Sequence, residues 1–304
     1  MLYRKIGSDR VSVIALGSGG FGAKISEGDA ARVMDAYRDA GGNVIDTGRI
    51  YCGGRSEACI GNWMKERGVR GEIFLVTKGG HPELPSWRRR INRAEITADL
   101  EASLIALDTD VIDLYFLHRD DESLPVSEIM PILDRFVREG KVRYLGASNW
   151  SATRIEEANA FARVNGMAEF AASQILWNYT QVNQSALPDQ TLRVMDEKEH
   201  ARYEKNGIPV MAYTSQAQGF FSYYEKGKIP DALMRDYMNE TTRVRAERVL
   251  AVARACGVSP TAVALAALLH DSVPAIPVIG ASSPERVAEA FAALTPDATV
   301  LATL

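Results

Sequence analysis

Short apolar runs alternate along this chain with longer stretches in which apolar residues recur every three or four positions. The short runs are typical of buried strands, and the longer stretches are typical of amphipathic helices. We expect the strands at residues 14–16, 44–45, 73–76, 111–117, 142–147, 171–176, 208–213 and 275–279. Because a helical stretch follows each strand, the pattern predicts an α/β fold, the (β/α)8 TIM barrel.

Capping residues and glycines set the boundaries of the expected helices. Ser26 is placed to cap a helix that runs to Ala40, where Gly41-Gly42 ends it. The other expected helices start after Asn92, Ser151, Ser259 and Ser283 or cover residues 56–66, 127–139, 192–206 and 243–256. Residues 2–13 predict an N-terminal β-hairpin, and residues 215–242 a long, aromatic-rich loop over the C-terminal face.

Composition argues against a nucleic-acid-binding, membrane or secreted protein and leaves the predicted fold unchanged. Hydrophobic residues make up 46% of the 304 residues and the formal net charge is −4, so nothing favours nucleic-acid binding. No apolar run approaches the ~20 residues that span a bilayer, and we expect no membrane contact. Three cysteines without a CxxC pair and a start without a secretory signal predict a cytoplasmic protein. Without a visible linker, we expect one domain over residues 1–304, in an oligomeric state that the sequence leaves open.

Polar or ionisable residues follow nearly every predicted strand. In a (β/α)8 barrel the chemistry takes place at the C-terminal ends of the strands. The residues at these positions are glycines 17–22, Asp46 with Tyr51, Lys78, His118, Ser148 with Asn149, Gln174, Tyr213, and residues 280–283. We therefore expect an active site at this face.

Three consecutive strand ends supply the ingredients of a proton-transfer site. A tyrosine phenol ordinarily has a pKa near ~10, and an ammonium group beside it stabilises the phenolate. Lys78 is placed to act in this way on Tyr51, and His118 to hydrogen-bond the same oxygen. A buried lysine needs a counter-charge, which Asp46 supplies. No part of this chemistry requires a metal.

The motifs around these residues resemble those of the aldo-keto reductases. The resemblance covers the chain almost from end to end. It is carried by Asp46-Thr47 through Tyr51, Gly53, Ser56-Glu57, residues 76–78, residues 113–118, residues 140–149, Gln174, Trp177-Asn178 and residues 209–213. It implies NADPH-dependent reduction of an aldehyde or ketone, or the reverse reaction. By this resemblance Tyr51 is the general acid, Lys78 assists it, Asp46 holds Lys78, and His118 orients the carbonyl.

The resemblance also implies where the cofactor binds. NADPH is the expected cofactor, with NADH as an alternative. Residues 280–286 open a helix whose free N–H groups favour phosphate, and Arg286 and Ser282 are placed for the 2′-phosphate. The expected cofactor contacts are Gly20, Ser148, Asn149 and Gln174 (the carboxamide), Tyr213 (the nicotinamide ring), Thr214, Gln216 and Gln218 (the pyrophosphate), Gly280, Ser282, Arg286 and Glu289 (the adenine amino group). Two departures weaken the match, because residues 214–216 differ from the usual Ser-Pro-Leu and residue 290 is alanine.

The expected substrate is a small carbonyl compound whose identity the sequence does not fix. The loops that follow the strands offer Phe21, Trp87, Asp120, Asp121, Asn178, Tyr179, Phe220 and Phe221. Carboxylates and amides beside aromatic rings suit a polar or sugar-like carbonyl, and they also tolerate aromatic aldehydes. Cys52 is interpreted as a small packing residue.

Two alternatives remain open at this point. Gly17-x-Gly19-x-x-Gly22 follows a strand and mimics a Rossmann fingerprint, which would make the chain an NAD-dependent dehydrogenase with Asp46 on the ribose. A non-catalytic NADPH-binding regulatory subunit would share the barrel, since fold does not fix function.

Overall fold

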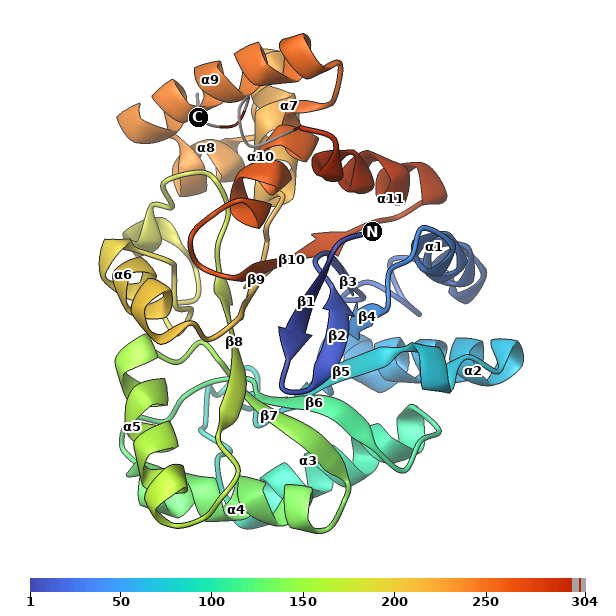
Figure 1. The fold of residues 1–304 in the computed structure, drawn as a ribbon, viewed down its shortest axis with the longest axis vertical. Coiled ribbons are helices and arrows are strands. Elements are labelled where there is room, and N and C mark those ends of the chain that lie inside the picture. Colours follow the sequence, from blue (N-terminus) through green and yellow to red (C-terminus); the bar gives the residue numbers. More distant parts are fainter. Residues whose placement is uncertain (297–300, 302–304) are drawn as a thin grey trace.

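The computed structural model describes residues 1–296 and 301, and its centre is a closed barrel of eight parallel strands (Figure 1). The strands lie in chain order and the last pairs with the first, as the sequence predicts. They are β3 (Ala15–Gly17), β4 (Val44–Asp46), β5 (Phe74–Gly79), β6 (Ile112–Leu117), β7 (Val142–Ser148), β8 (Phe170–Leu176), β9 (Val210–Tyr213) and β10 (Ala275–Gly280). The (β/α)8 prediction is confirmed.

Helices cover the outside of this barrel. Those that follow the strands are α1 (Glu27–Asp39), α2 (Arg55–Arg67), α3 (Arg93–Ala106), α4 (Val126–Arg138), α5 (Ala152–Val164), α6 (Glu197–Asn206), α10 (Pro260–Leu269) and α11 (Pro284–Phe291). Ser26, Asn92, Ser151 and Ser259 cap their helices through their side chains as predicted. Ser283 occupies the cap position of α11 without such a bond, so the first N–H groups of this helix have no side-chain cap.

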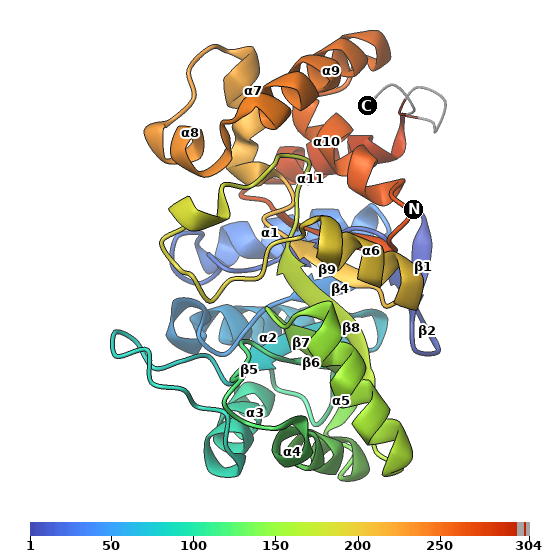
Figure 2. The same cartoon turned by 90° about the vertical axis from the view of Figure 1, so that its left-hand side faces the viewer.

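Two expected boundaries are wrong. The helix predicted from Leu192 begins at Glu197, because Asp196 accepts hydrogen bonds from the backbone N–H groups of Lys198 and Glu199 and so caps it. The segment predicted as a loop over 215–242 contains α7 (Phe220–Glu225) and α8 (Asp231–Tyr237), and α9 (Glu240–Cys256) follows. Figure 2 shows these three helices gathered with α10 at one end of the molecule.

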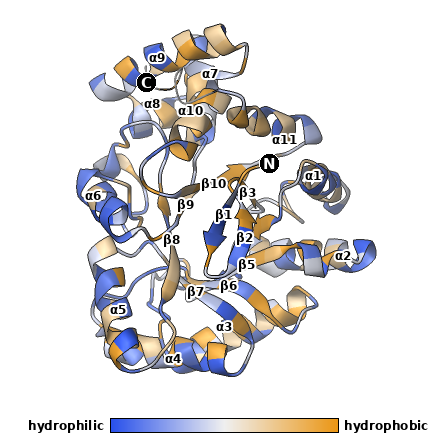
Figure 3. Cartoon of the chain, viewed as in Figure 1, coloured by the Kyte–Doolittle hydropathy of each residue, from blue (hydrophilic) through white to orange (hydrophobic). Residues whose placement is uncertain are grey.

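The predicted hairpin, β1 (Tyr3–Ile6) with β2 (Asp9–Ser12), closes the N-terminal end of the barrel. Its Ile6 and Val11 are buried among the apolar side chains that fill the barrel interior. A larger apolar layer lies between the strands and the helices, whose outward faces are polar (Figure 3). The hairpin leaves the opposite, C-terminal end of the barrel open for chemistry. None of the described helices is long and apolar enough to cross a membrane alone; α9 and α10, bent by 103°, reach the required length and composition only as a pair.

Asp113 on β6 anchors the hairpin end of the barrel. Its buried carboxylate accepts from the backbone N–H of Leu75 and pairs with Arg70 and Arg143, which in turn reaches Asp9 of the hairpin. We expect Asp113→Ala to lower the free energy of unfolding by about 3 kcal/mol, because the buried N–H of Leu75 loses its side-chain acceptor and Arg70 and Arg143 each lose one of their partners. Asp9→Ala, which removes a more exposed pair, should cost about 1 kcal/mol or less. Urea denaturation measures both, and equal losses would contradict this role of Asp113.

Candidate active site

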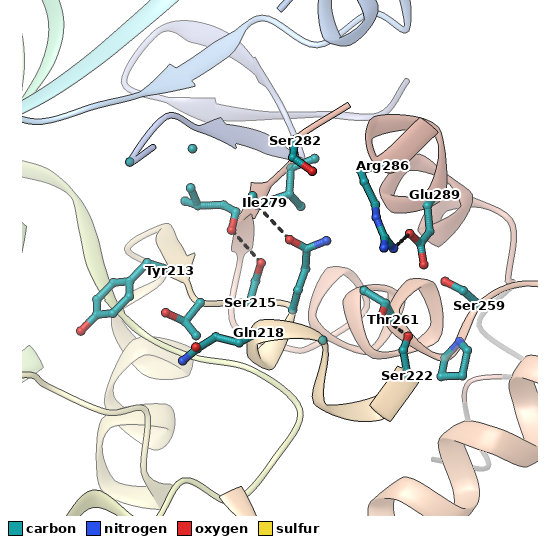
Figure 4. A pocket seen from close by; sticks show the side chains of 18 of the residues that line it. Tyr213, Ser215, Gln218, Ser222, Ser259, Thr261, Ile279, Ser282, Arg286 and Glu289 are labelled. Carbon is teal, nitrogen blue, oxygen red and sulfur yellow. Dashed lines mark hydrogen bonds and ion pairs between the residues drawn. The ribbon is translucent and has the colours of Figure 1, made fainter. Parts of the chain in front are cut away.

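A cleft of about 950 Å³ opens at the C-terminal face of the barrel. Its lining includes Asp46 and Tyr51, residues at the ends of β3, β9 and β10, and Arg286 on α11. Figure 4 shows the part between Tyr213 and Arg286. Its volume is at the upper end of that of small-molecule sites, and its length suits an extended ligand.

Lys78 and Asp46 form a buried ion pair at the inner end of the cleft. The Lys78 Nζ lies 2.8 Å from both carboxylate oxygens of Asp46 and donates to the backbone carbonyl of Thr47 at 2.6 Å. The parallel pairing of β4 with β5 places the two side chains together. Burial, the largest single influence, would lower the pKa of Lys78, but the charges of Asp46 and Tyr51 and their hydrogen bonds to the ammonium together outweigh it, and the pKa is raised. The ammonium is therefore charged at neutral pH.

Tyr51 lies between this ion pair and His118. The Lys78 Nζ is 4.9 Å from the centre of the Tyr51 ring, and the His118 ring meets it edge-on at 5.6 Å. The position of Tyr51 depends on a tight turn, because Cys52, Gly53 and Gly54 all have positive φ angles. Gly48 lies beside both rings, since a Cβ atom there would be in ordinary van der Waals contact with Tyr51 and His118 at 3.5–3.6 Å. The four residues expected to perform the chemistry are therefore adjacent.

His118 is buried and electrically neutral. Burial is the main cause that holds its pKa well below the ordinary value, and the charges of Arg119 and Lys78 add to it. Its Nδ1 is buried without a protein partner. A neutral imidazole beside Tyr51 can donate a hydrogen bond to a carbonyl oxygen, and the position of its proton is not fixed by the protein.

The buried His118 predicts a pH dependence of stability. In the unfolded chain its imidazole binds a proton near pH 6.5, whereas in the folded protein it does not. The associated stability is thus complete above pH 6.5 and is lost as the pH falls toward the folded-state pKa, by up to about 1.4 kcal/mol per pH unit. Urea denaturation from pH 7.5 to 5 should show a smaller loss in His118→Asn than in the wild type. His270→Asn, at an exposed histidine, is the control, and an unchanged slope in His118→Asn would contradict the assignment.

The predicted carboxamide contacts lie behind the inner end of the cleft. Gln174 donates to Asp46 at 2.9 Å through Nε2, which leaves its carbonyl oxygen without a protein partner. Asn149 is saturated by protein groups: its oxygen accepts from the Tyr213 hydroxyl and the Arg193 N–H, and its amide donates to His118 and Ser148. A direct contact between Asn149 and a cofactor therefore requires the exchange of one of these bonds.

The outer half of the cleft contains most of the residues predicted to bind the rest of the cofactor. Tyr213, Thr214, Gln216, Gln218, Gly280, Ser282, Arg286 and Glu289 all line it, whereas Gly19 does so in place of the predicted Gly20. The side chain of Gln216 accepts from the backbone N–H of Gly280 at 2.9 Å, so this glutamine links the two walls. Arg286 and Glu289 form an ion pair at 2.7 Å (Figure 4). The uncapped start of α11, with Ser282 before it, fits a phosphate group.

Most residues predicted to contact the substrate have other partners. Asp120 is buried and pairs with Arg154 at 2.8 Å, and Asp121 accepts from Ser123. Tyr179 packs on Phe221 and under Arg245. Phe21, Phe220 and Phe221 are core residues with exposures of 0–1%. These six side chains are therefore committed to packing or to protein partners, and their contact with a substrate stays a prediction.

Trp87 and Asn178 remain available to contact a substrate, and His81 is a further candidate that the sequence does not predict. Trp87 is 44% exposed, and the Nδ2 of Asn178 is buried without a protein partner. His81 was missed, although it lies only three residues after Lys78. Its ring is 4.8 Å from that of His118 and 6.4 Å from that of Trp87. A row of four aromatic rings thus leads from the exposed Trp87 to Tyr51.

Comparison with known proteins identifies the family of this chain. A model of the Aldo/keto reductase family matches residues 13–301. The chain belongs to the aldo/keto reductase family. Norsolorinic acid reductase B of Dothistroma septosporum is 31% identical to it over 315 residues, 97% of this chain and 78% of that protein. The NADP(+) aldo-keto reductase yakc of Schizosaccharomyces pombe is 30% identical over 310 residues, 96% and 86% of the two chains.

Further relatives of this aldo/keto reductase support the same conclusion. An aryl-alcohol dehydrogenase of Pestalotiopsis microspora is 30% identical over 303 residues, 95% of this chain and 76% of that protein. The crystal structure of a thermostable aldo-keto reductase with the inhibitor epalrestat superimposes with a TM-score of 0.74 over 99% of this chain and 98% of the other. At 22% identity, that likeness shows the shared fold.

Family membership makes the protein an oxidoreductase that reduces carbonyl groups with NADPH. The Rossmann interpretation of residues 17–22 is wrong, because the sheet is a closed barrel and Asp46 pairs with Lys78.

Proposed function

We propose that this aldo/keto reductase reduces aromatic aldehydes or ketones to alcohols, with Tyr51 as the proton donor. The observation that carries the proposal is the row of rings from Trp87 through His81 and His118 to Tyr51. A planar substrate can lie against such rings with its carbonyl oxygen at the phenol. The name of one relative, aryl-alcohol dehydrogenase, supports the aromatic class.

The residues at the inner end of the cleft divide the proton chemistry among them. Tyr51 donates its hydroxyl proton to the carbonyl oxygen, and the charged Lys78 stabilises the phenolate that remains. Asp46 keeps Lys78 charged and in place, and the neutral His118 donates a hydrogen bond that orients the carbonyl. The bound cofactor supplies the hydride.

The expected cofactor contacts follow the shape of the cleft. Tyr213 would stack on the nicotinamide, with Ser148 and the free carbonyl of Gln174 near the carboxamide. Gly280, Ser282 and the start of α11 would hold phosphate groups. Tyr213 is kept in position by its hydrogen bond to Asn149, which in turn bonds to the His118 backbone.

A sugar-like substrate is the weaker possibility. Three of the side chains that favour it, Asp120, Asp121 and Tyr179, have protein partners. The Nδ2 of Asn178 is a buried donor without one. The carboxylates of Asp120 and Asp121 already bind protein groups and are less able to accept hydrogen bonds from sugar hydroxyls. The exposed side chain of Trp87 offers a surface on which an aromatic ring can stack.

A substrate panel tests both the proposed substrate class and the proposed catalytic activity. NADPH oxidation would be followed at the nicotinamide absorbance with aryl aldehydes, aryl ketones and open-chain sugars. We expect the highest kcat/KM for the aromatic compounds, and Trp87→Leu should raise their KM with little change for a small aliphatic aldehyde. Higher kcat/KM for sugars would overturn the substrate class. A protein that binds NADPH but reduces nothing in the panel would instead be a non-catalytic subunit.

A further inference from the structure

The distribution of charge along the cleft does not by itself explain how the protein would hold NADPH. Among the described residues that line it, the cations are Arg286 and Lys226. Arg286 is paired with Glu289 on the same helix, so its charge already has a partner within the protein. NADPH exceeds NADH by one phosphate ester, which carries about −1.5 to −2 charges at neutral pH. Preference for NADPH therefore calls for a cation beyond the Arg286–Glu289 pair.

Lys226 is in a position to supply this charge. It is the C-cap residue of α7 and follows Ser222 by four residues, so the two side chains share a helix face. Ser222 lines the cleft and is hydrogen-bonded to Thr261 of α10 at 3.0 Å, which fixes this face toward the cavity. Figure 4 shows Ser222, Thr261 and Ser259 across the cavity from Arg286 and Glu289. Lys226 thus belongs to the wall that faces Arg286.

The charge of Lys226 is also uncommitted. Its side chain is exposed, and within the described part of the chain it makes no ion pair within 4 Å. The nearest acid in sequence, Glu225, lines the same wall but does not pair with it. The remaining acid of the cleft, Asp46, is neutralised by Lys78 at the other end.

We propose that Lys226 contacts the 2′-phosphate of NADPH from the wall opposite Arg286 and so determines the preference for NADPH over NADH. The 2′-phosphate would lie between Lys226 and Arg286. Arg286 would then share its hydrogen-bond donors between the phosphate and Glu289. The inference rests on the proposed function only in taking NADPH as the cofactor. The pyrophosphate, which NADPH and NADH share, is the other anion that this lysine could meet.

Equilibrium binding of both cofactors distinguishes these roles. Quenching of protein fluorescence would give Kd values for NADPH and NADH with the wild type, Lys226→Gln, Lys226→Arg and the control Lys228→Gln, an exposed lysine outside the cleft. We expect Lys226→Gln to raise the Kd of NADPH about tenfold and that of NADH less than about twofold, as a lost charge-assisted hydrogen bond would. Lys226→Arg should restore most of the affinity, and Lys228→Gln should not change it.

The other outcomes are separable. Equal weakening of NADPH and NADH would place Lys226 at the pyrophosphate and overturn the inference. Unchanged binding of NADPH by Lys226→Gln would also overturn it while leaving the proposed function intact. A wild type that fails to bind NADPH would instead contradict the proposed function itself.

Discussion

Replacing Tyr51 with phenylalanine is expected to reduce the rate of carbonyl reduction by about 10²–10⁴-fold, the range that a general acid contributes. The substitution removes one oxygen atom from a ring that packs beside Lys78 and His118, so the shape of the site should persist. NADPH affinity should remain within about twofold, because the phenol acts on the carbonyl group. The loss should appear in kcat more than in KM, as for an interaction made mainly in the transition state.

The matched control is Tyr223→Phe. Tyr223 also lines the cleft, and it is 41% exposed on α7, away from the Lys78–Asp46 pair. Its substitution makes the same chemical change without removing the proposed proton donor. Turnover by Tyr51→Phe near the wild-type rate, measured with the best aromatic substrate and saturating NADPH, would contradict the assignment. Equal losses in both variants would point to a general disturbance of the cleft.

The barrel and its catalytic corner could be predicted because their signals are local. An apolar run and the polar residue at its end lie within a few positions of each other, and the barrel brings successive strand ends together. Asp46 and Lys78 are far apart in sequence, yet β4 and β5 pair as neighbours. The alternation of strands and helices therefore predicts the contact between these two side chains.

The parts that were mispredicted depend on partners that the sequence does not reveal. Asp120 looked available because Arg154, its partner, lies 34 positions later on α5. The helices α7 and α8 are only 6 and 7 residues long, too short for a clear period, and their stability comes from burial of Phe220 and Tyr237. His81 was overlooked because its role depends on the ring of His118, which another strand supplies.

Removing Lys78 should lower both stability and activity, whereas Tyr51→Phe should lower activity alone. Lys78→Met leaves the carboxylate of Asp46 buried, at 4% exposure, with Gln174 as its remaining side-chain donor. Breaking a buried pair in this way is expected to lower the free energy of unfolding by about 3–5 kcal/mol. Activity should also fall steeply, because the ammonium that stabilises the phenolate is gone.

The double variant Asp46→Asn/Lys78→Met separates these two effects. With both charges removed, an uncharged amide can still accept from Gln174, and most of the lost stability should return. Activity should not return, since stabilisation of the phenolate needs the positive charge itself. Urea denaturation and NADPH-coupled turnover, measured on the wild type, both single variants and the double variant, test this directly. If the double variant regained turnover along with stability, Lys78 would be a structural residue, and the proton chemistry would have to rest on Tyr51 and His118 alone.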